Sequence, residues 1–251
     1  MKTINFMGQR KLAFVFSALL IIASIASLAT KQLDWGLDFT GGTLVEVHYS
    51  ETADLEAIRE TLTTGGYAGA VVVSFGTDRD VLIRLPQGFS DTEGVAILEK
   101  LQSSFSGSVE LRRIEFVGPQ VGDELREQGG LAMLMALGLV MLYIAFRFQF
   151  KFALGAVVAL VHDVIVTLGF FSIVGMEFDL TVLAALLAVI GYSLNDTIVV
   201  SDRIRENFRK IRKADPVEVI NISLTETLGR TLVTSLTTLL VLMALALFGG
   251  E

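Results

Sequence analysis

The stretch GYSLNDTIVVSDRIREN, residues 191–207, begins like an apolar membrane helix and ends like a charged helix in water. Asn195 and Asp196 lie within its apolar part, where an ionised side chain costs roughly 2.5–3.5 kcal/mol at the bilayer centre on insertion scales. Such a residue is expected to face the interior of a helix bundle, a partner or water. The stretch therefore predicts a membrane helix that carries a functional acid.

The whole chain has the composition of a protein with several membrane spans. Of its 251 residues, 52% are hydrophobic, which is too many for an ordinary soluble domain. A helix needs about 20 apolar residues to cross the hydrocarbon core. Five stretches approach that length: residues 12–30, 130–146, 152–174, 180–201 and 229–248. The first is longer than the roughly 7–15 apolar residues of a signal peptide, so we expect it to be a retained anchor.

Basic residues in the short loops predict the orientation of these spans. They precede the first span (Lys2, Arg10, Lys11), separate the second from the third (Arg147, Lys151) and follow the fourth (Arg203, Arg205, Arg209, Lys210, Arg212, Lys213). Residues 175–179 contain none. We therefore expect a cytoplasmic N-terminus and first span over residues 1–30, an extracytoplasmic domain over 31–128, and spans two to five over 129–251 with a cytoplasmic loop at 202–227.

Residues 43–118 alternate between strand-like and helix-like patterns. Strands are predicted at 43–50, 70–76, 80–86 and 108–118 from alternating and β-branched residues. Helices are predicted at 54–66, with Asp54 as N-cap, and at 91–105, with one apolar face formed by Val95, Leu98, Leu101 and Phe105. The order βαββαβ is that of a ferredoxin-like fold. The predicted fold class is a membrane α-helical bundle of five spans with an extracytoplasmic α+β ferredoxin-like domain.

Two glycine-containing segments border this domain, DWGLDFTGG at 34–42 and GPQVGDEL at 118–125. Glycine permits a tight turn, and an aspartate can hydrogen-bond the backbone of such a turn. We expect structural elbows that hold the domain against the membrane, with a substrate contact at the first as the alternative. Their key residues are Asp38, Gly41, Gly42, Gly118 and Pro119.

Nothing in the predicted outside domain indicates catalysis. Gly41-Gly42 lacks the Lys-Ser/Thr that a phosphate-binding P-loop requires, and His48 lies in a strand without an obvious partner. The chain has no cysteine and two histidines, so we expect no metal site. The sequence predicts a domain that contacts another protein, and a chain that is not an enzyme.

Polar residues inside three of the spans need a separate explanation: Asp196 with Asn195, Arg230, and His162 with Asp163. Antiparallel helices would bring Asp196 and Arg230 to the same depth, where they are expected to pair until Asp196 takes up a proton. Imidazole titrates near neutral pH, so His162 can also carry a proton, and adjacent helix positions need not contact each other. These residues predict an intramembrane proton or ion relay. A structural polar cluster and a snorkelling Arg230 remain alternatives.

Four motifs in order resemble the SecD/SecF family of the bacterial Sec protein-translocation machinery, related to resistance-nodulation-division transporters. They are GLDFTGG (36–42), LVHDVIVTLG (160–169), GYSLNDTIVVSDRIREN (191–207) and TLGRTLVTS (227–235). The single short outside region is similar to the SecF type. The resemblance implies a subunit that assists export of unfolded preproteins across the inner membrane with protons as coupling ion. It implies contact with a SecD-like subunit, the SecYEG channel, a YajC-type small membrane subunit and membrane lipid, and none with nucleic acid.

In that family, the aspartate of Asn-Asp-Thr, an arginine on the following helix and a threonine four residues later lie on the proton path. The resemblance places these roles on Asp196, Arg230 and Thr234, so the predicted relay comprises Asp196, Arg230, Thr234, Asn195, His162 and Asp163. The family has a sixth span, so we expect a truncated chain or one that lacks it, and Ser201 stands where an aromatic residue is usual. A translocon scaffold without ion flux and half of a small-molecule exporter are alternative functions.

Overall fold

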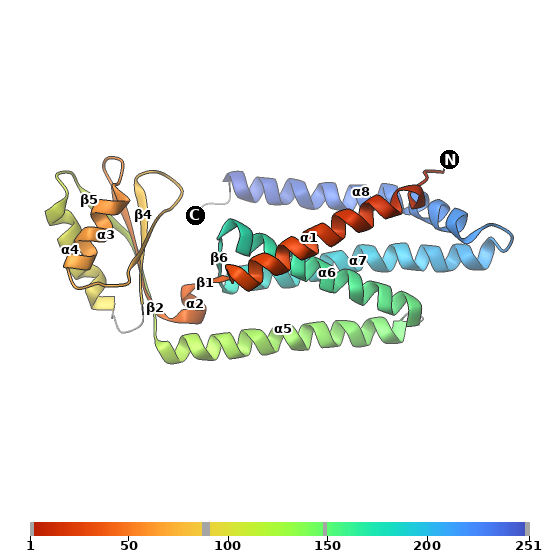
Figure 1. Cartoon of the computed structure of the whole chain (residues 1–251), viewed down its shortest axis with the longest axis horizontal. Helices are drawn as coiled ribbons and strands as arrows, with labels where there is room; N and C mark the ends of the chain where they lie inside the picture. The colour runs from red at the N-terminus through yellow and green to blue at the C-terminus, as the bar shows by residue number, and fades with distance from the viewer. Residues whose placement is uncertain (1–2, 87–90, 148–149, 249–251) are drawn as a thin grey trace. The chain divides into compact units, whose positions relative to one another are not determined.

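The structure is a computed structural model that describes residues 3–86, 91–147 and 150–248 (Figure 1). Contacts divide the chain into two compact units. The helical unit comprises Met1–Gln32, Leu137–Val174 and Ala185–Glu251, and the sheet unit comprises Leu33–Ala136 and Gly175–Ala184. Two long helices, α5 (Pro119–Arg147) and α7 (Leu180–Lys210), contribute residues to both units.

The sheet unit has the predicted ferredoxin-like topology. Its strands are β2 (Gly42–Tyr49), β3 (Val71–Ser74), β4 (Asp80–Leu85) and β5 (Val109–Val117), in the spatial order β3-β4-β2-β5 with antiparallel neighbours. Helices α3 (Leu55–Thr64) and α4 (Asp91–Ser104) connect them and lie on one face of the sheet (Figure 1). Asp54 caps α3 as expected, because its carboxylate accepts hydrogen bonds from the amides of Glu56 and Ala57.

Alternate strand residues and the inner faces of both helices form the core of this unit. Val45, Val47 and Ile83 are fully buried against Leu62 and the side chains of α4. The predicted apolar face of α4 was wrong in one position: Val95 is 50% exposed, whereas Ile97, which was not predicted, is fully buried with Leu101. The spacing of four residues between Ile97 and Leu101 sets the true face.

The prediction that His48 has no partner is also wrong. Its Nδ1 lies 2.5 Å from Oδ1 of Asp80, its cross-strand neighbour on β4. Hydrogen bonds from the Thr77 hydroxyl and then from His48 hold the pKa of Asp80 below its usual value. His48 thus belongs to a small polar cluster at the end of two strands.

Gly42 occupies a position that no other residue fits. Its φ is +128°, and an added Cβ would overlap the carbonyl oxygen of Leu85. We expect Gly42→Ala to lower the free energy of unfolding by about 2–5 kcal/mol, through backbone strain and overpacking together. Thermal unfolding of the purified chain in detergent measures the loss.

Gly66→Ala is the matched control for this prediction. Gly66 also has positive φ, +95°, but an added Cβ would meet nothing within 4 Å. Gly66→Ala should lower the free energy of unfolding only by the backbone strain, about 1–2 kcal/mol. Equal losses in the two variants would contradict the assigned overlap with Leu85.

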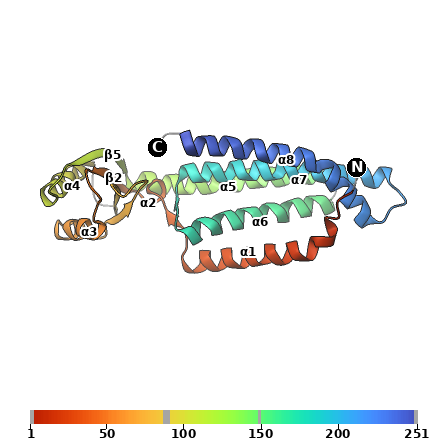
Figure 2. The same ribbon diagram turned by 90° about the horizontal axis from the view of Figure 1, so that it is seen from above.

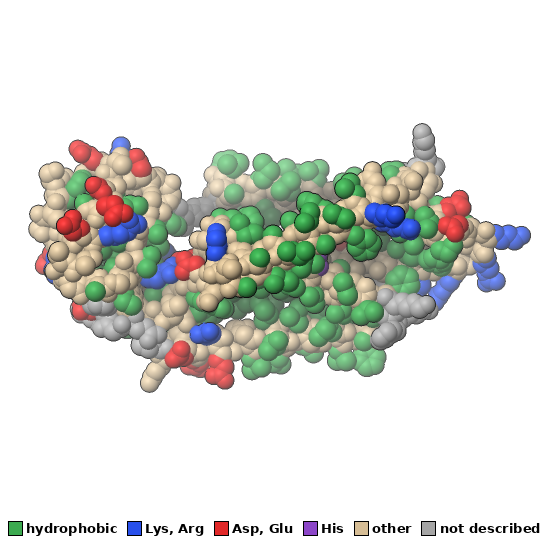
Figure 3. Space-filling model, in the orientation of Figure 1, with side chains coloured by type: hydrophobic (Ala, Val, Ile, Leu, Met, Phe, Trp, Pro, Cys, Tyr) green, Lys and Arg blue, Asp and Glu red, His purple; other side chains and the backbone are tan. Residues whose placement is uncertain are grey.

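Within the described residues, five helices are long and apolar enough to cross a membrane, as predicted. Besides α5 and α7 they are α1 (Arg10–Thr30), α6 (Phe150–Val174) and α8 (Pro216–Phe248). Hydrophobic side chains cover much of their outer surface (Figure 3). Because these side chains would be costly to expose to water, the protein is a multi-pass membrane protein.

Several helices extend beyond their predicted spans. The expected loop at 202–227 is largely helical, since only residues 211–215 separate α7 from α8. The elbow predicted at 118–125 is wrong beyond Gly118, because α5 begins at Pro119. Proline fits the first position of a helix, where no backbone N–H is needed. The predicted spans were too short because they covered only the apolar residues, whereas the helices continue through charged residues.

Helix α1 packs along α6 through small side chains (Figure 2). The hydroxyls of Ser27 and Ser172 share a buried hydrogen bond of 2.8 Å, and an added Cβ on Gly169 would collide with Ser24. Small residues allow such close approach where no hydrophobic driving force acts between helices in lipid. This pair forms one side of the helical unit.

Candidate functional site

A polar network lies on the facing surfaces of α6 and α7, within the helical unit. His162 Nδ1 lies 2.9 Å from Asp163 Oδ1, so these neighbours do contact each other. Ser193 Oγ on α7 donates to the other carboxylate oxygen of Asp163 at 2.5 Å. The Nε2 atom of His162 is buried and has no hydrogen-bond partner among the described residues. The network thus contains an acid and an imidazole nitrogen that can accept a proton.

Asp196 forms the second part of the site, between α7 and α8. Its Oδ1 accepts a hydrogen bond of 2.8 Å from Thr231 Oγ1. Ser193 and Asp196 are three residues apart and therefore share one face of α7. This face of α7 contacts α6 through Ser193 and α8 through Asp196. Asp163 of α6 and Asp196 of α7 therefore both lie along one polar strip on α7.

Tyr192 adds a third link that the sequence did not predict. Its hydroxyl donates to the carbonyl oxygen of Thr234 and accepts from Thr238, each at 2.5 Å. Thr234 is therefore at the α7–α8 contact, as expected for a relay residue, but its own hydroxyl bonds the carbonyl of Arg230. Its place next to Ser193, within a polar stretch of an apolar helix, could have indicated that Tyr192 takes part in this contact.

The predicted ion pair between Asp196 and Arg230 is wrong for this structure. Both residues are described, and no ion pair joins them. Successive helix residues point about 100° apart, so Thr231 faces Asp196 while Arg230 faces a neighbouring hollow. Asn195 is exposed for the same reason and has no hydrogen bond among the described side chains. The structure therefore brings His162 and Asp163 together and places Asp196 on the same strip of α7.

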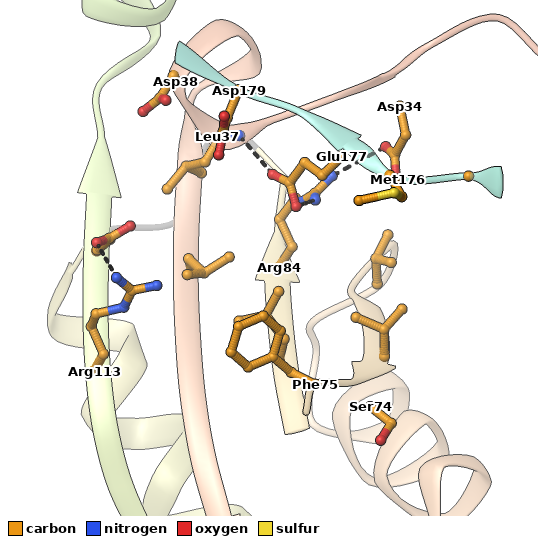
Figure 4. A pocket seen from close by; sticks show the side chains of 16 residues that line it. Asp34, Leu37, Asp38, Ser74, Phe75, Arg84, Arg113, Met176, Glu177 and Asp179 are labelled. Atoms are coloured by element: carbon orange, nitrogen blue, oxygen red, sulfur yellow. Dashed lines mark hydrogen bonds and ion pairs between the residues drawn. The ribbon is translucent and has the colours of Figure 1, made fainter. Parts of the chain in front are cut away.

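A second constellation lies in the sheet unit, at the N-terminus of α7 (Figure 4). Strand β1 (Asp34–Trp35) pairs in parallel with β6 (Glu177–Phe178). The Arg84 guanidinium on β4 forms ion pairs with Glu177 and, at 3.4 Å, with Asp34. Glu177 Oε1 also accepts from the amide of Leu37, the first residue of α2 (Leu37–Thr40). Three separate parts of the chain meet at this one arginine.

The expectation that Asp38 bonds its own turn is wrong. Asp38 Oδ2 accepts a hydrogen bond of 3.0 Å from the amide of Leu180, 142 residues away. Asp179 Oδ1 accepts from the amide of Val182 at 2.7 Å. Two carboxylates thus satisfy free amides of the first turn of α7, where the helix dipole favours negative charge. Gly41 and Gly42 do make the predicted tight turn, with positive φ.

The arginine and the acids border a hollow of about 610 Å³ (Figure 4). Its lining also includes the apolar side chains of Leu44 and Leu82. Among the residues that the structure describes, no group of three His, Cys, Asp or Glu is arranged to hold a metal ion.

We call the contacts of Arg84, Glu177, Asp38 and Leu180 the α7 latch.

Comparison with known proteins places the chain among export proteins. Residues 97–251 match the family model for the C-terminal part of the protein export membrane protein SecD/SecF, and residues 26–53 match that for the SecD/SecF GG motif. The chain is 55% identical to protein translocase subunit SecF of Pseudomonas aeruginosa, over 99% of this chain and 81% of that protein. It is 46% identical to SecF of Escherichia coli O157:H7, over 99% and 78%.

Two solved structures of SecDF are also similar. The crystal structure of SecDF, a translocon-associated membrane protein from Thermus thermophilus, matches with 39% identity and a TM-score of 0.88 over 99% of this chain. SecDF in a super-membrane-facing form matches with 38% identity and a TM-score of 0.70 over 100%. The chain covers 34% and 35% of the length of these two proteins.

Proposed function

Because the chain belongs to the SecD/SecF family of protein export membrane proteins, we propose that it is a SecF-type accessory subunit of the Sec translocase. It acts with a SecD-type partner and uses the proton-motive force to help draw unfolded preproteins through the SecYEG channel of the bacterial inner membrane. A YajC-type subunit is a further partner. The observation that supports proton coupling most directly is the polar face of α7, within apolar helices, where Ser193 donates to Asp163 of α6 and Asp196 accepts from Thr231 of α8.

Asp196 is the proposed proton-binding group. In the structure the hydroxyl of Thr231 donates a hydrogen bond of 2.8 Å to its carboxylate. A proton that enters from the extracytoplasmic side neutralises the group and weakens this bond, and release to the cytoplasm restores it. Moving one unit charge through 100 mV supplies about 2.3 kcal/mol. That energy is enough to shift the balance between two arrangements of the helices.

The two arrangements differ in the residue of α8 that meets Asp196. Thr231 meets it in the structure, and Arg230 lies one position earlier. A partial rotation of α8, together with the reach of the arginine side chain, would exchange one for the other, because successive residues differ by about 100°. The proposed cycle alternates between these partners. Asp163 and His162 form a second proton-exchanging group on the same strip.

Helix α7 couples this site to the sheet unit. It is continuous from Leu180 to Lys210 and carries Asp196 about 24 Å from its first residue. The α7 latch holds that first residue to the sheet unit through Asp38, and holds the preceding strand β6 through Arg84 and Glu177. A displacement of α7 would therefore be passed to the domain that the sequence predicts to contact another protein.

Reconstitution tests the proposed function. Inner-membrane vesicles that lack this subunit but hold its SecD-type partner are compared with vesicles to which the chain is restored. We expect preprotein export to rise on restoration only while a proton gradient is present, and an ionophore to remove the gain. A gain of the same size after the gradient is collapsed would reject proton coupling.

The orientation gives a separate prediction that uses the absence of cysteine from the chain. Glu51→Cys and Lys213→Cys place single thiols at exposed positions. We expect a membrane-impermeant maleimide to label Glu51→Cys in intact spheroplasts and Lys213→Cys only after lysis, because the basic loops stay in the cytoplasm. The reverse pattern would contradict the proposed topology.

A further inference from the structure

A hollow of about 640 Å³ lies between the charged parts of α7 and α8. Five of its lining side chains are basic and three are acidic. Ile198 and Val199 line it where α7 becomes apolar. The hollow therefore combines an apolar wall with an excess of positive charge, close to the predicted membrane surface.

The acids of the hollow are already engaged. Glu206 pairs with Arg203 at 3.1 Å and with Lys210 at 2.6 Å, Glu226 pairs with Arg203 at 3.7 Å, and Asp202 pairs with Arg205 at 3.5 Å. Arg209 and Arg230 form no ion pair with any residue in the described part of the chain. Two guanidinium groups in one hollow thus have no counter-anion among the residues that the structure describes.

We propose that this hollow binds the phosphate group of an anionic phospholipid, held by Arg209 and Arg230. Guanidinium groups bind phosphate oxygens through paired, charge-assisted hydrogen bonds. The apolar wall of Ile198 and Val199 fits the start of an acyl chain, which a soluble anion does not have. Basic clusters next to a membrane helix favour anionic lipid over neutral lipid. The shared chemistry is a phosphate group, and lipid is the source that the apolar wall favours.

Native mass spectrometry of the purified chain in neutral detergent tests this proposal. The chain is titrated separately with phosphatidylglycerol, phosphatidylcholine and inorganic phosphate. We expect phosphatidylglycerol to bind about tenfold more tightly than phosphatidylcholine, and Arg209→Gln to remove most of that preference. Arg212→Gln is the matched control, since Arg212 is an exposed arginine that does not line the hollow.

Three outcomes would overturn the proposal. Equal binding of the two lipids would exclude a site for anionic headgroups. Equal losses in Arg209→Gln and Arg212→Gln would indicate diffuse charge attraction. Inorganic phosphate that binds as tightly as phosphatidylglycerol would assign the site to free phosphate. If Arg209→Gln loses helix content, Arg230→Gln replaces it in the same assay, with the same expected loss of preference.

Discussion

Replacement of Asp196 by Asn is expected to abolish the proton-driven part of export while export that does not depend on the gradient continues. The amide keeps the shape of the side chain and can still accept a hydrogen bond from Thr231. It cannot bind and release a proton, so the helix bundle no longer gains energy from the gradient. At 100 mV that energy is about 2.3 kcal/mol for one proton, and its loss should lower the rate by up to about fiftyfold.

The control for this variant is Asp215→Asn, which makes the same chemical change outside the membrane. Asp215 is exposed and accepts a hydrogen bond from the amide of Val217 at the start of α8. Asparagine also caps helices well, so export should stay unchanged. Export is measured in the reconstituted vesicles with and without an ionophore. If Asp196→Asn restores full proton-dependent export, the site assignment fails; if any variant that assembles restores gradient-independent export, the subunit is a scaffold.

The membrane spans and the ferredoxin-like domain were predictable because each follows from a local pattern. Apolar runs of sufficient length mark a span, and alternation marks a strand that is buried on one face. The ends of the helices were not predictable in the same way. Residues 203–210 continue α7 as a charged helix, and a hydropathy window cannot distinguish such a helix from a loop.

The candidate site was predictable as a set of residues but not as a set of contacts. Asp196 was identified because an ionised side chain is costly in the hydrocarbon of the membrane. Its partner, however, depends on the rotation of α8 about its own axis, which decides whether Arg230 or Thr231 faces Asp196. The partner of Asp38 lies 142 residues away, so no local pattern identifies it. The proton-relay roles of Asp196, Arg230, Thr234, Asn195, His162 and Asp163 stay predictions.

Replacement of Arg84 by Gln is expected to uncouple α7 from the sheet unit. Arg84 is mostly buried, and its loss leaves Glu177 without its ion pair. Because Glu177 and Asp34 are partly exposed, we expect a local cost of about 1–2 kcal/mol, or about five- to thirtyfold faster hydrogen exchange over residues 175–184. Proton-driven export should fall as well, although Asp163 and Asp196 are unchanged.

Arg113→Gln separates this coupling from a general loss of stability. Arg113 borders the same hollow and pairs with two carboxylates, Glu46 at 3.4 Å and Glu115 at 3.1 Å, but both of these lie in the sheet. The control should therefore leave exchange in residues 175–184 and export unchanged. If Arg84→Gln speeds exchange there and export still responds fully to the proton gradient, α7 does not transmit the proton cycle through the latch, and the force must reach the sheet unit through α5.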